Sequence, residues 1–188
     1  ALCAFDMIGF IKKEFPDREI VLGGGLVTSW MKRPGWNNPF GGLVDHLVAG
    51  PGERPLLSLL GVKDVKREHA VPDYDTLPLR DYLSPGFILP YSGSSGCYWN
   101  QCSFCPEMAE DNPYIPVSPH QVIADLAALI AKTKPALIHL LDNSISPVLM
   151  DALVSRAFGI PWYGFARISR ELTDPDYCQS LKRSGCVM

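Results

Sequence analysis

From residue 87 onward, short apolar runs alternate with segments that have helical periodicity. The apolar runs lie at residues 87–92, 136–142 and 162–166, and a further one begins at Cys186. Ser118, Ser146 and Asp174 each precede a proline, which is typical of a helix N-cap followed by the first helical turn. Because parallel strands need a crossover connection, this alternation predicts a parallel α/β sheet. About four consecutive strand–helix units are expected, which is half of an eight-unit barrel.

The first 61 residues show the same alternation on a smaller scale. Residues 2–15 have the apolar spacing of a helix, and residues 18–25 form a β-rich run that ends in three glycines. Residues 43–50 predict a second strand, and residues 52–61 predict a helix that stops at Gly61. We therefore expect one α/β domain at residues 1–61 and another at 87–188. Residues 62–86 contain several prolines and no sustained periodicity, and they are predicted to be a linker.

Charge and hydropathy exclude several classes of function. The net charge is −3, with 17 basic and 20 acidic residues intermixed, so the sequence predicts no binding to nucleic acid or to an anionic membrane. No apolar run approaches the roughly 20 residues that cross a bilayer. The chain lacks a signal-peptide pattern, which predicts a cytoplasmic protein. It begins with Ala1 and ends on apolar residues after a glycine, and we expect a fragment of a longer protein.

Three of the six cysteines lie within nine positions, in the stretch GCYWNQCSFCPE at residues 96–107. Six cysteines in 188 residues are far fewer than a disulfide scaffold contains. Cys3, Cys178 and Cys186 stand singly in apolar periodic segments and are expected to be small buried hydrophobic residues. The clustered three therefore need a separate explanation.

A zinc site and an iron–sulfur cluster are the two metal sites that this loop could form. A structural zinc site needs four ligands, usually as two pairs, but Cys102 and Cys105 form the only C-x2-C pair. Cys97 would be a third ligand, and His120 is the nearest other candidate. Three cysteines without a fourth protein ligand fit a 4Fe–4S cluster with one open iron. A zinc-stabilised binding module without catalysis and a cluster protein that only transfers electrons remain alternatives.

The stretch SGSSGCYWNQCSFCPE resembles the cluster motif of the radical SAM enzymes. Its spacing is C-x4-C-x2-C, whereas C-x3-C-x2-C is commoner in that family, and Phe104 stands where the family has an aromatic residue. The stretches FPDREIVLGGGLVTS and VDHLVAGPGERPLLSLL resemble the end of the cobalamin-binding domain that precedes the barrel in one subgroup. PDYDTLPLRDYL is similar to that subgroup's linker. The resemblance implies a partial Rossmann-like domain followed by the first strands and helices of a partial TIM-type β/α barrel.

The resemblance also implies a reaction. Cys97, Cys102 and Cys105 would ligate a 4Fe–4S cluster, and S-adenosylmethionine would bind the open iron. One electron from the reduced cluster would cleave that molecule to methionine and a 5′-deoxyadenosyl radical. The implied partners are a flavodoxin- or ferredoxin-like electron donor and a small-molecule or peptide substrate. The sequence does not identify that substrate.

Four residues are implied to contact S-adenosylmethionine. The backbone around Phe104 would lie beside the adenine, and Asp142 and Asn143 would contact the methionine amine. Arg167 would meet a carboxylate or the ribose. A helix cap or loop contact would also explain Asp142, and a surface ion pair would explain Arg167.

Gly23 and Gly24 are implied to let the backbone approach the nucleotide tail of cobalamin. A tight strand-to-loop turn would explain these glycines equally well. The histidine motif that binds cobalt is absent from the chain, so cobalamin rests on the resemblance of residues 1–61 alone. His46 and His139 lie in predicted strands, and we expect both to be structural residues with satisfied side chains.

Overall fold

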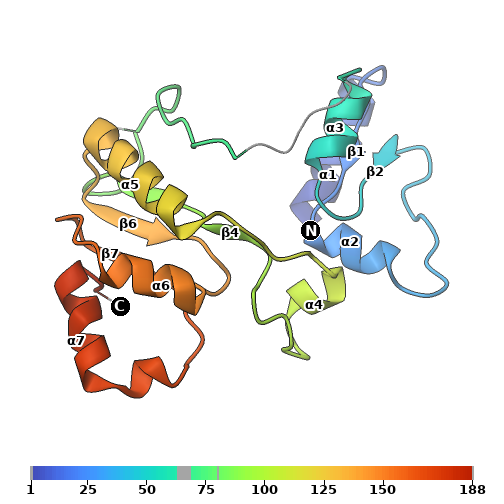
Figure 1. Ribbon diagram of the computed structural model, residues 1–188. Coiled ribbons are helices and arrows are strands. Elements are labelled where there is room, and N and C mark those ends of the chain that lie inside the picture. Colours follow the sequence, from blue (N-terminus) through green and yellow to red (C-terminus); the bar gives the residue numbers. More distant parts are fainter. Residues whose placement is uncertain (1, 63–68, 80, 188) are drawn as a thin grey trace. The chain divides into compact units, whose positions relative to one another are not determined.

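The computed structural model describes residues 2–62, 69–79 and 81–187. The chain divides into two compact units, one of residues 1–67 with 101–112 and one of residues 68–100 with 113–188 (Figure 1). Both contain helices and small parallel sheets, so the predicted α/β class is confirmed. No closed barrel is present among the described residues. In the same part of the chain, no helix is long and apolar enough to cross a bilayer.

The first unit is built around a two-stranded parallel sheet. Its elements are α1 (Leu2–Glu14), β1 (Val21–Leu22), α2 (Gly25–Met31), β2 (His46–Leu47), α3 (Glu53–Leu59) and α4 (Pro106–Glu110). Val21 of β1 pairs with His46 of β2. Beneath them, Phe40 stacks on Phe5 and Trp30, with ring centroids 5.4 and 6.4 Å apart. Phe40 belongs to the buried core of this unit with Ile8 and Val44, and Phe5 and Trp30 pack against that core.

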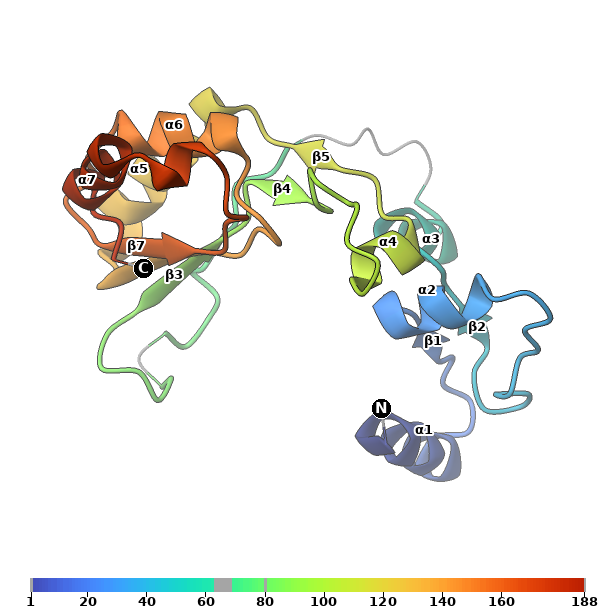
Figure 2. The same ribbon diagram turned by 90° about the horizontal axis from the view of Figure 1, so that it is seen from below.

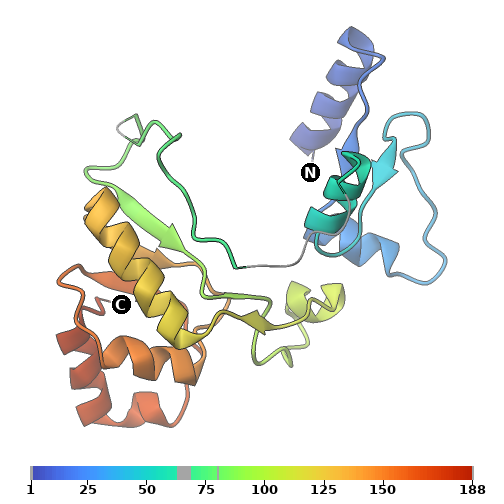
Figure 3. The same cartoon turned by 45° about the horizontal axis from the view of Figure 1, so that its top comes forward.

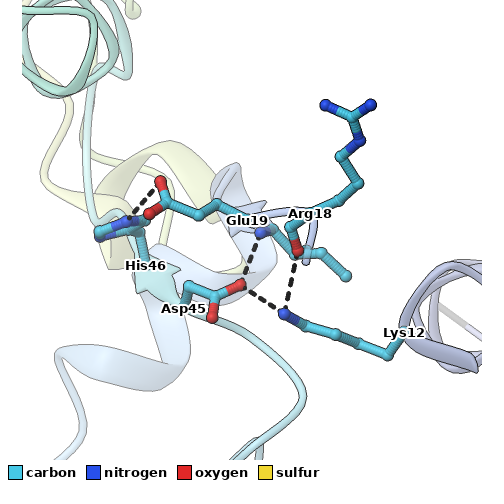
Figure 4. A network of polar contacts seen from close by, with 6 residues as sticks. Lys12, Arg18, Glu19, Asp45 and His46 are labelled. Carbon is cyan, nitrogen blue, oxygen red and sulfur yellow. Dashed lines mark hydrogen bonds and ion pairs between the residues drawn. The ribbon is translucent and has the colours of Figure 1, made fainter. Parts of the chain in front are cut away.

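A polar network joins α1 to the sheet of the first unit (Figure 4). Asp45 Oδ2 accepts hydrogen bonds from Lys12 Nζ at 2.8 Å and from the Ile20 N–H at 2.7 Å. Lys12 also donates to the Arg18 carbonyl at 3.0 Å. The Lys12 hydrogen bond, followed by that from Ile20, lowers the pKa of Asp45. The network holds the C-terminal part of α1 against the residues that enter β1 and β2.

The second unit contains three parallel strands in chain order. They are β3 (Ile88–Tyr91), β6 (Leu137–Leu140) and β7 (Trp162–Gly164), and a single parallel bridge joins Trp162 to Cys186. The helices α5 (Pro119–Thr133), α6 (Pro147–Val154) and α7 (Pro175–Ser184) follow the strands in turn. α5 contacts α6 and α6 contacts α7, and the three helices lie on one side of the sheet (Figure 2). The strands predicted at residues 87–92, 136–142 and 162–166 and the helices that follow them are therefore confirmed. The strand expected to begin at Cys186 is present only as that single bridge.

Strand periodicity determines which side chains enter the core of the second unit. Leu89, Tyr91, Ile138 and Leu140 point toward the helices and are buried. Val122, Leu126 and Leu129 of α5 belong to the same buried core. Figure 3 shows α5 beside the strands of this unit.

The predicted helix caps are present in the second unit. The side chains of Ser118, Ser146 and Asp174 each accept a backbone hydrogen bond from the first turn of the following helix. Gly185 has φ 102°, a left-handed conformation that favours glycine and ends α7. These local signals explain why the helices begin where the sequence analysis expects them.

Two short helices and the burial of the single cysteines differ from expectation. α2 and α4 were not predicted, because both are shorter than eight residues and neither has a side-chain N-cap hydrogen bond. Cys3 and Cys178 are exposed and Cys186 is half-buried, so the expectation of buried cysteines is wrong. Among the described side chains of α1, only Ile8 is buried, and Cys3 does not share its buried position.

Candidate cysteine-loop site

The cysteine loop leaves the C-terminal end of β3 and begins with a small antiparallel ladder. β4 (Ser94–Ser95) pairs with β5 (Ile115–Pro116), and the Val117 N–H donates to the Gly93 carbonyl at 2.9 Å. Gly96 has φ 74°, and a Cβ there would lie 2.6 Å from the Pro113 carbonyl oxygen. Only glycine fits this position, so the turn that leads into Cys97 is specified by sequence.

The three clustered cysteines are free thiols, and all are half-buried. Cys97 belongs to the second unit, and Cys102 and Cys105 belong to the first. The Cys105 N–H donates to the Cys102 carbonyl at 2.9 Å, and Cys105 is the N-cap of α4. No three Cys, His, Asp or Glu side chains are gathered as a metal site within the described residues. The donor set itself fits iron or zinc, because reduced and partly accessible thiols are the ligands that both metals use.

Asp142 fastens the base of the cysteine loop from the neighbouring strand. This aspartate follows β6 and is only 1% exposed. Its Oδ2 accepts the Gly93 N–H at 2.9 Å, and its Oδ1 accepts the Ser94 hydroxyl at 2.5 Å. The loop-contact alternative for Asp142 is therefore observed. The adjacent Asn143 is exposed.

Arg167 reaches the same loop from the third strand. Its guanidinium carbon lies 3.5 Å from the ring centroid of Trp99, two positions after Cys97. The Arg167 N–H donates to the Ser144 hydroxyl at 3.1 Å. No ion pair joins Arg167 to an acidic side chain among the described residues, so the surface-ion-pair explanation is not observed there. A guanidinium stacked on an aromatic ring keeps its N–H donors available at its edge.

The remaining predicted site residues belong to the first unit. Gly24 has φ 94° and accepts the Thr28 N–H at 2.9 Å as α2 begins. A Cβ on Gly23 would lie 3.2 Å from the Val48 carbonyl oxygen, which is a tight approach. A strand-to-helix turn therefore accounts for both glycines. Phe104 is 89% exposed, so core filling does not explain this aromatic residue.

The second half of the cysteine loop is held by α2, which the sequence did not predict. Lys32, the C-cap of α2, donates to the carbonyl of Glu110, the last residue of α4. Its Nζ lies 3.5 Å from the Asp111 carboxylate. A Cβ on Gly25 would occupy the space that the Glu110 carboxylate takes. The glycine turn and the segment with Cys102 and Cys105 are thus neighbours within the first unit.

His139 differs from its expected role as a satisfied structural residue. Its ring stacks on Tyr163, with centroids 4.3 Å apart and planes at 11°. Its Nε2 is buried and has no hydrogen-bond partner among the described residues. The expectation is wrong because His139 points to the face of the sheet away from the helices, where aromatic rings and not polar groups surround it. His46 lies in β2, as its strand pattern predicted, and its Nε2 is 3.5 Å from the Glu19 carboxylate.

A buried carboxylate on α5 was missed in the sequence analysis. Asp125 is 2% exposed and accepts hydrogen bonds from Tyr91 Oη at 2.6 Å and Gln121 Nε2 at 2.7 Å. His69 Nε2 lies 2.5 Å from the same carboxylate. The side chain of Gln121 therefore binds Asp125, one helical turn further along α5. The signal was an acidic residue three positions after Val122, on the apolar stripe of the helix.

The hydrogen bonds to Asp125 predict a loss of stability in acid. Burial alone would raise the pKa of Asp125, but the hydrogen bonds from Tyr91, Gln121 and His69 outweigh it and hold the pKa below 3.8. Such a carboxylate stabilises the fold above its unfolded pKa, and this contribution is lost as the pH falls through the folded value. We expect the free energy of unfolding to decrease below about pH 4. Urea unfolding at several pH values should show a smaller decrease for Asp125→Asn, and equal decreases would contradict the assignment.

The chain matches no protein family, no curated protein and no solved structure. The second unit offers one thiol, a buried carboxylate and a stacked guanidinium at the carboxyl edge of a parallel sheet. The first unit offers two thiols in a tight turn. Parallel α/β proteins place their active sites at this edge.

Proposed function

We propose that this protein is a radical SAM enzyme chain that binds a 4Fe–4S cluster through Cys97, Cys102 and Cys105. The observation that carries the proposal is the convergence of the strand ends on the cysteine loop. Asp142, after β6, holds Gly93 and Ser94, and Arg167, after β7, covers Trp99. Three successive parallel strands thus contribute to the surroundings of one cysteine-bearing loop.

A bound cluster would supply the electron that cleaves S-adenosylmethionine reductively to methionine and a 5′-deoxyadenosyl radical. The chain's own residues would bind and orient that molecule. Arg167 would pair with its carboxylate, Asn143 would meet its amine, and the backbone at Phe104 would lie beside its adenine. Asp142 would hold the loop in place through the hydrogen bonds that its carboxylate accepts.

The fold is consistent with this proposal at two points. Parallel strands in chain order, with consecutive helices on one side, are the repeating pattern of a β/α barrel. The β1–β2 pair and its glycine turn are compatible with part of a Rossmann-like cobalamin domain. We propose a cytoplasmic enzyme that takes electrons from a flavodoxin- or ferredoxin-like donor, with cobalamin as a second cofactor. Its substrate would be a small molecule or a peptide.

Replacing Arg167 tests the proposed binding of the carboxylate. We expect Arg167→Gln to weaken the affinity of the iron-reconstituted protein for S-adenosylmethionine about tenfold or more, because a charge-assisted hydrogen bond is lost. Anaerobic titration calorimetry measures the dissociation constant. Arg170→Gln is the matched control, because Arg170 is exposed and precedes the short helix Glu171–Thr173. Equal affinities of the two variants would contradict the assignment.

A further inference from the structure

Asp125 joins three separate segments of the second unit. It lies on α5, and its Oδ2 contacts both Tyr91, the last residue of β3, and His69, which precedes the sheet in sequence. Tyr91 is 1% exposed and Asp125 is 2% exposed, whereas the His69 side chain is 31% exposed. His69 is therefore the solvent-facing end of a series of hydrogen bonds that runs through Asp125 to Tyr91. Tyr91 lies two positions before Gly93, where the cysteine loop begins.

Residues 69–79, which we name the strap, are held to the same unit at further points. Lys132 of α5 lies 3.2 Å from the Asp73 carboxylate and 2.6 Å from that of Asp75. Tyr74 donates its hydroxyl to the Pro90 carbonyl, and its ring packs edge-on against Phe87 at 5.7 Å. The strap contains no helix or strand among its residues, yet it is fastened to α5 and β3.

We propose that His69, Asp125 and Tyr91 form a positioning set that fixes where the cysteine loop leaves β3. The relevance of this set to a metal cluster rests on the proposed function, but the contacts themselves do not. Asp125 Oδ2 accepts hydrogen bonds from both His69 and Tyr91. Loss of the histidine therefore removes one hydrogen-bond donor from a buried carboxylate and exposes that carboxylate to water. Tyr91 is followed directly by Ser92 and Gly93, and Gly93 is held by Asp142. Two buried carboxylates thus hold the residues where the loop begins: Asp125 binds Tyr91, and Asp142 binds Gly93 and Ser94.

This arrangement distinguishes the positioning set from simple attachment of the strap. His69 and Lys132 both tie the strap to α5, but only His69 contacts the carboxylate that also binds Tyr91. Removing Lys132 weakens the strap through an exposed ion pair and leaves the Asp125–Tyr91 hydrogen bond intact. A comparison of the two residues therefore separates the two roles.

Hydrogen–deuterium exchange of the backbone amides of residues 92–100 tests the proposal in the full chain. We expect His69→Ala to accelerate exchange there about tenfold. His69→Gln keeps one hydrogen-bond donor, so its exchange should stay within about threefold of that of the unmodified chain. Lys132→Met, the control that removes only the exposed ion pair, should stay within the same limit. Tyr91→Phe removes the hydroxyl alone and should match His69→Ala. Equal exchange in His69→Ala and Lys132→Met would overturn the proposal, as would failure of His69→Gln to restore protection.

The iron content of the same samples after anaerobic reconstitution separates this inference from the proposed function. Accelerated exchange in His69→Ala without iron uptake by any sample would refute the cluster and support the positioning set. Iron uptake with unchanged exchange would refute the positioning set and leave the cluster standing. The two proposals can thus fail independently.

Discussion

Replacing Cys97, Cys102 or Cys105 with alanine is expected to reduce the iron content after anaerobic reconstitution from about four irons per chain to less than about one. All three thiols are free and half-buried, so none is committed to a disulfide in the folded chain. A cluster with one open iron has three protein ligands and no spare one, and loss of a single thiolate should therefore prevent assembly. Iron and acid-labile sulfide are measured on the purified variants.

The chain contains its own matched control for this experiment. Cys3 and Cys178 are exposed and Cys186 is half-buried, and all three are free thiols outside the loop. Alanine at these positions should leave the iron content unchanged within error. If the two groups of variants lost iron equally, non-specific binding by thiols would explain the uptake and the loop would have no special role.

Asp142→Ala is expected to lower the free energy of unfolding of the second unit by about 3 kcal/mol. The carboxylate is 1% exposed and accepts hydrogen bonds from the Gly93 N–H and the Ser94 hydroxyl. Alanine would leave both donors unpaired near the core, and a buried donor without a partner costs about 1–3 kcal/mol. Urea denaturation, followed by tryptophan fluorescence, measures the change.

Asp151→Ala is the control for the Asp142 variant. Asp151 lies on α6, is exposed and accepts one hydrogen bond from Tyr177 at 2.7 Å. Its loss should cost less than about 1 kcal/mol, because solvent replaces the contact. A cost of that size for Asp142→Ala as well would show that the aspartate does not anchor the loop.

Local signals explain which parts of the fold could be predicted. Ser118, Ser146 and Asp174 mark helix starts by their own side chains, and Gly185 marks a helix end by its conformation. These are interactions within a few residues of one another, so the sequence contains them directly. Strand–helix alternation predicted the parallel order of β3, β6 and β7, because a parallel pair of strands needs a crossover connection between them.

The unpredicted features depend on contacts between distant segments. α4 has five residues and is held by Lys32, 78 positions away from Glu110. The strap had no periodicity to identify it, and its attachment depends on His69 and Lys132 meeting acids far along the chain. Arg167 was predicted to bind a ligand, but its stacking on Trp99 required the ends of two strands to meet. Single-sequence patterns do not contain such pairings.

Electron paramagnetic resonance of the reconstituted, dithionite-reduced chain, with and without S-adenosylmethionine, tests the central claim most directly. We predict about four irons per chain and a reduced-cluster signal that shifts when S-adenosylmethionine is added, because that molecule binds the open iron. A signal that does not shift would indicate a cluster that only transfers electrons. One zinc per chain with no uptake of iron would contradict the proposal outright and make Cys97, Cys102 and Cys105 part of a structural zinc site.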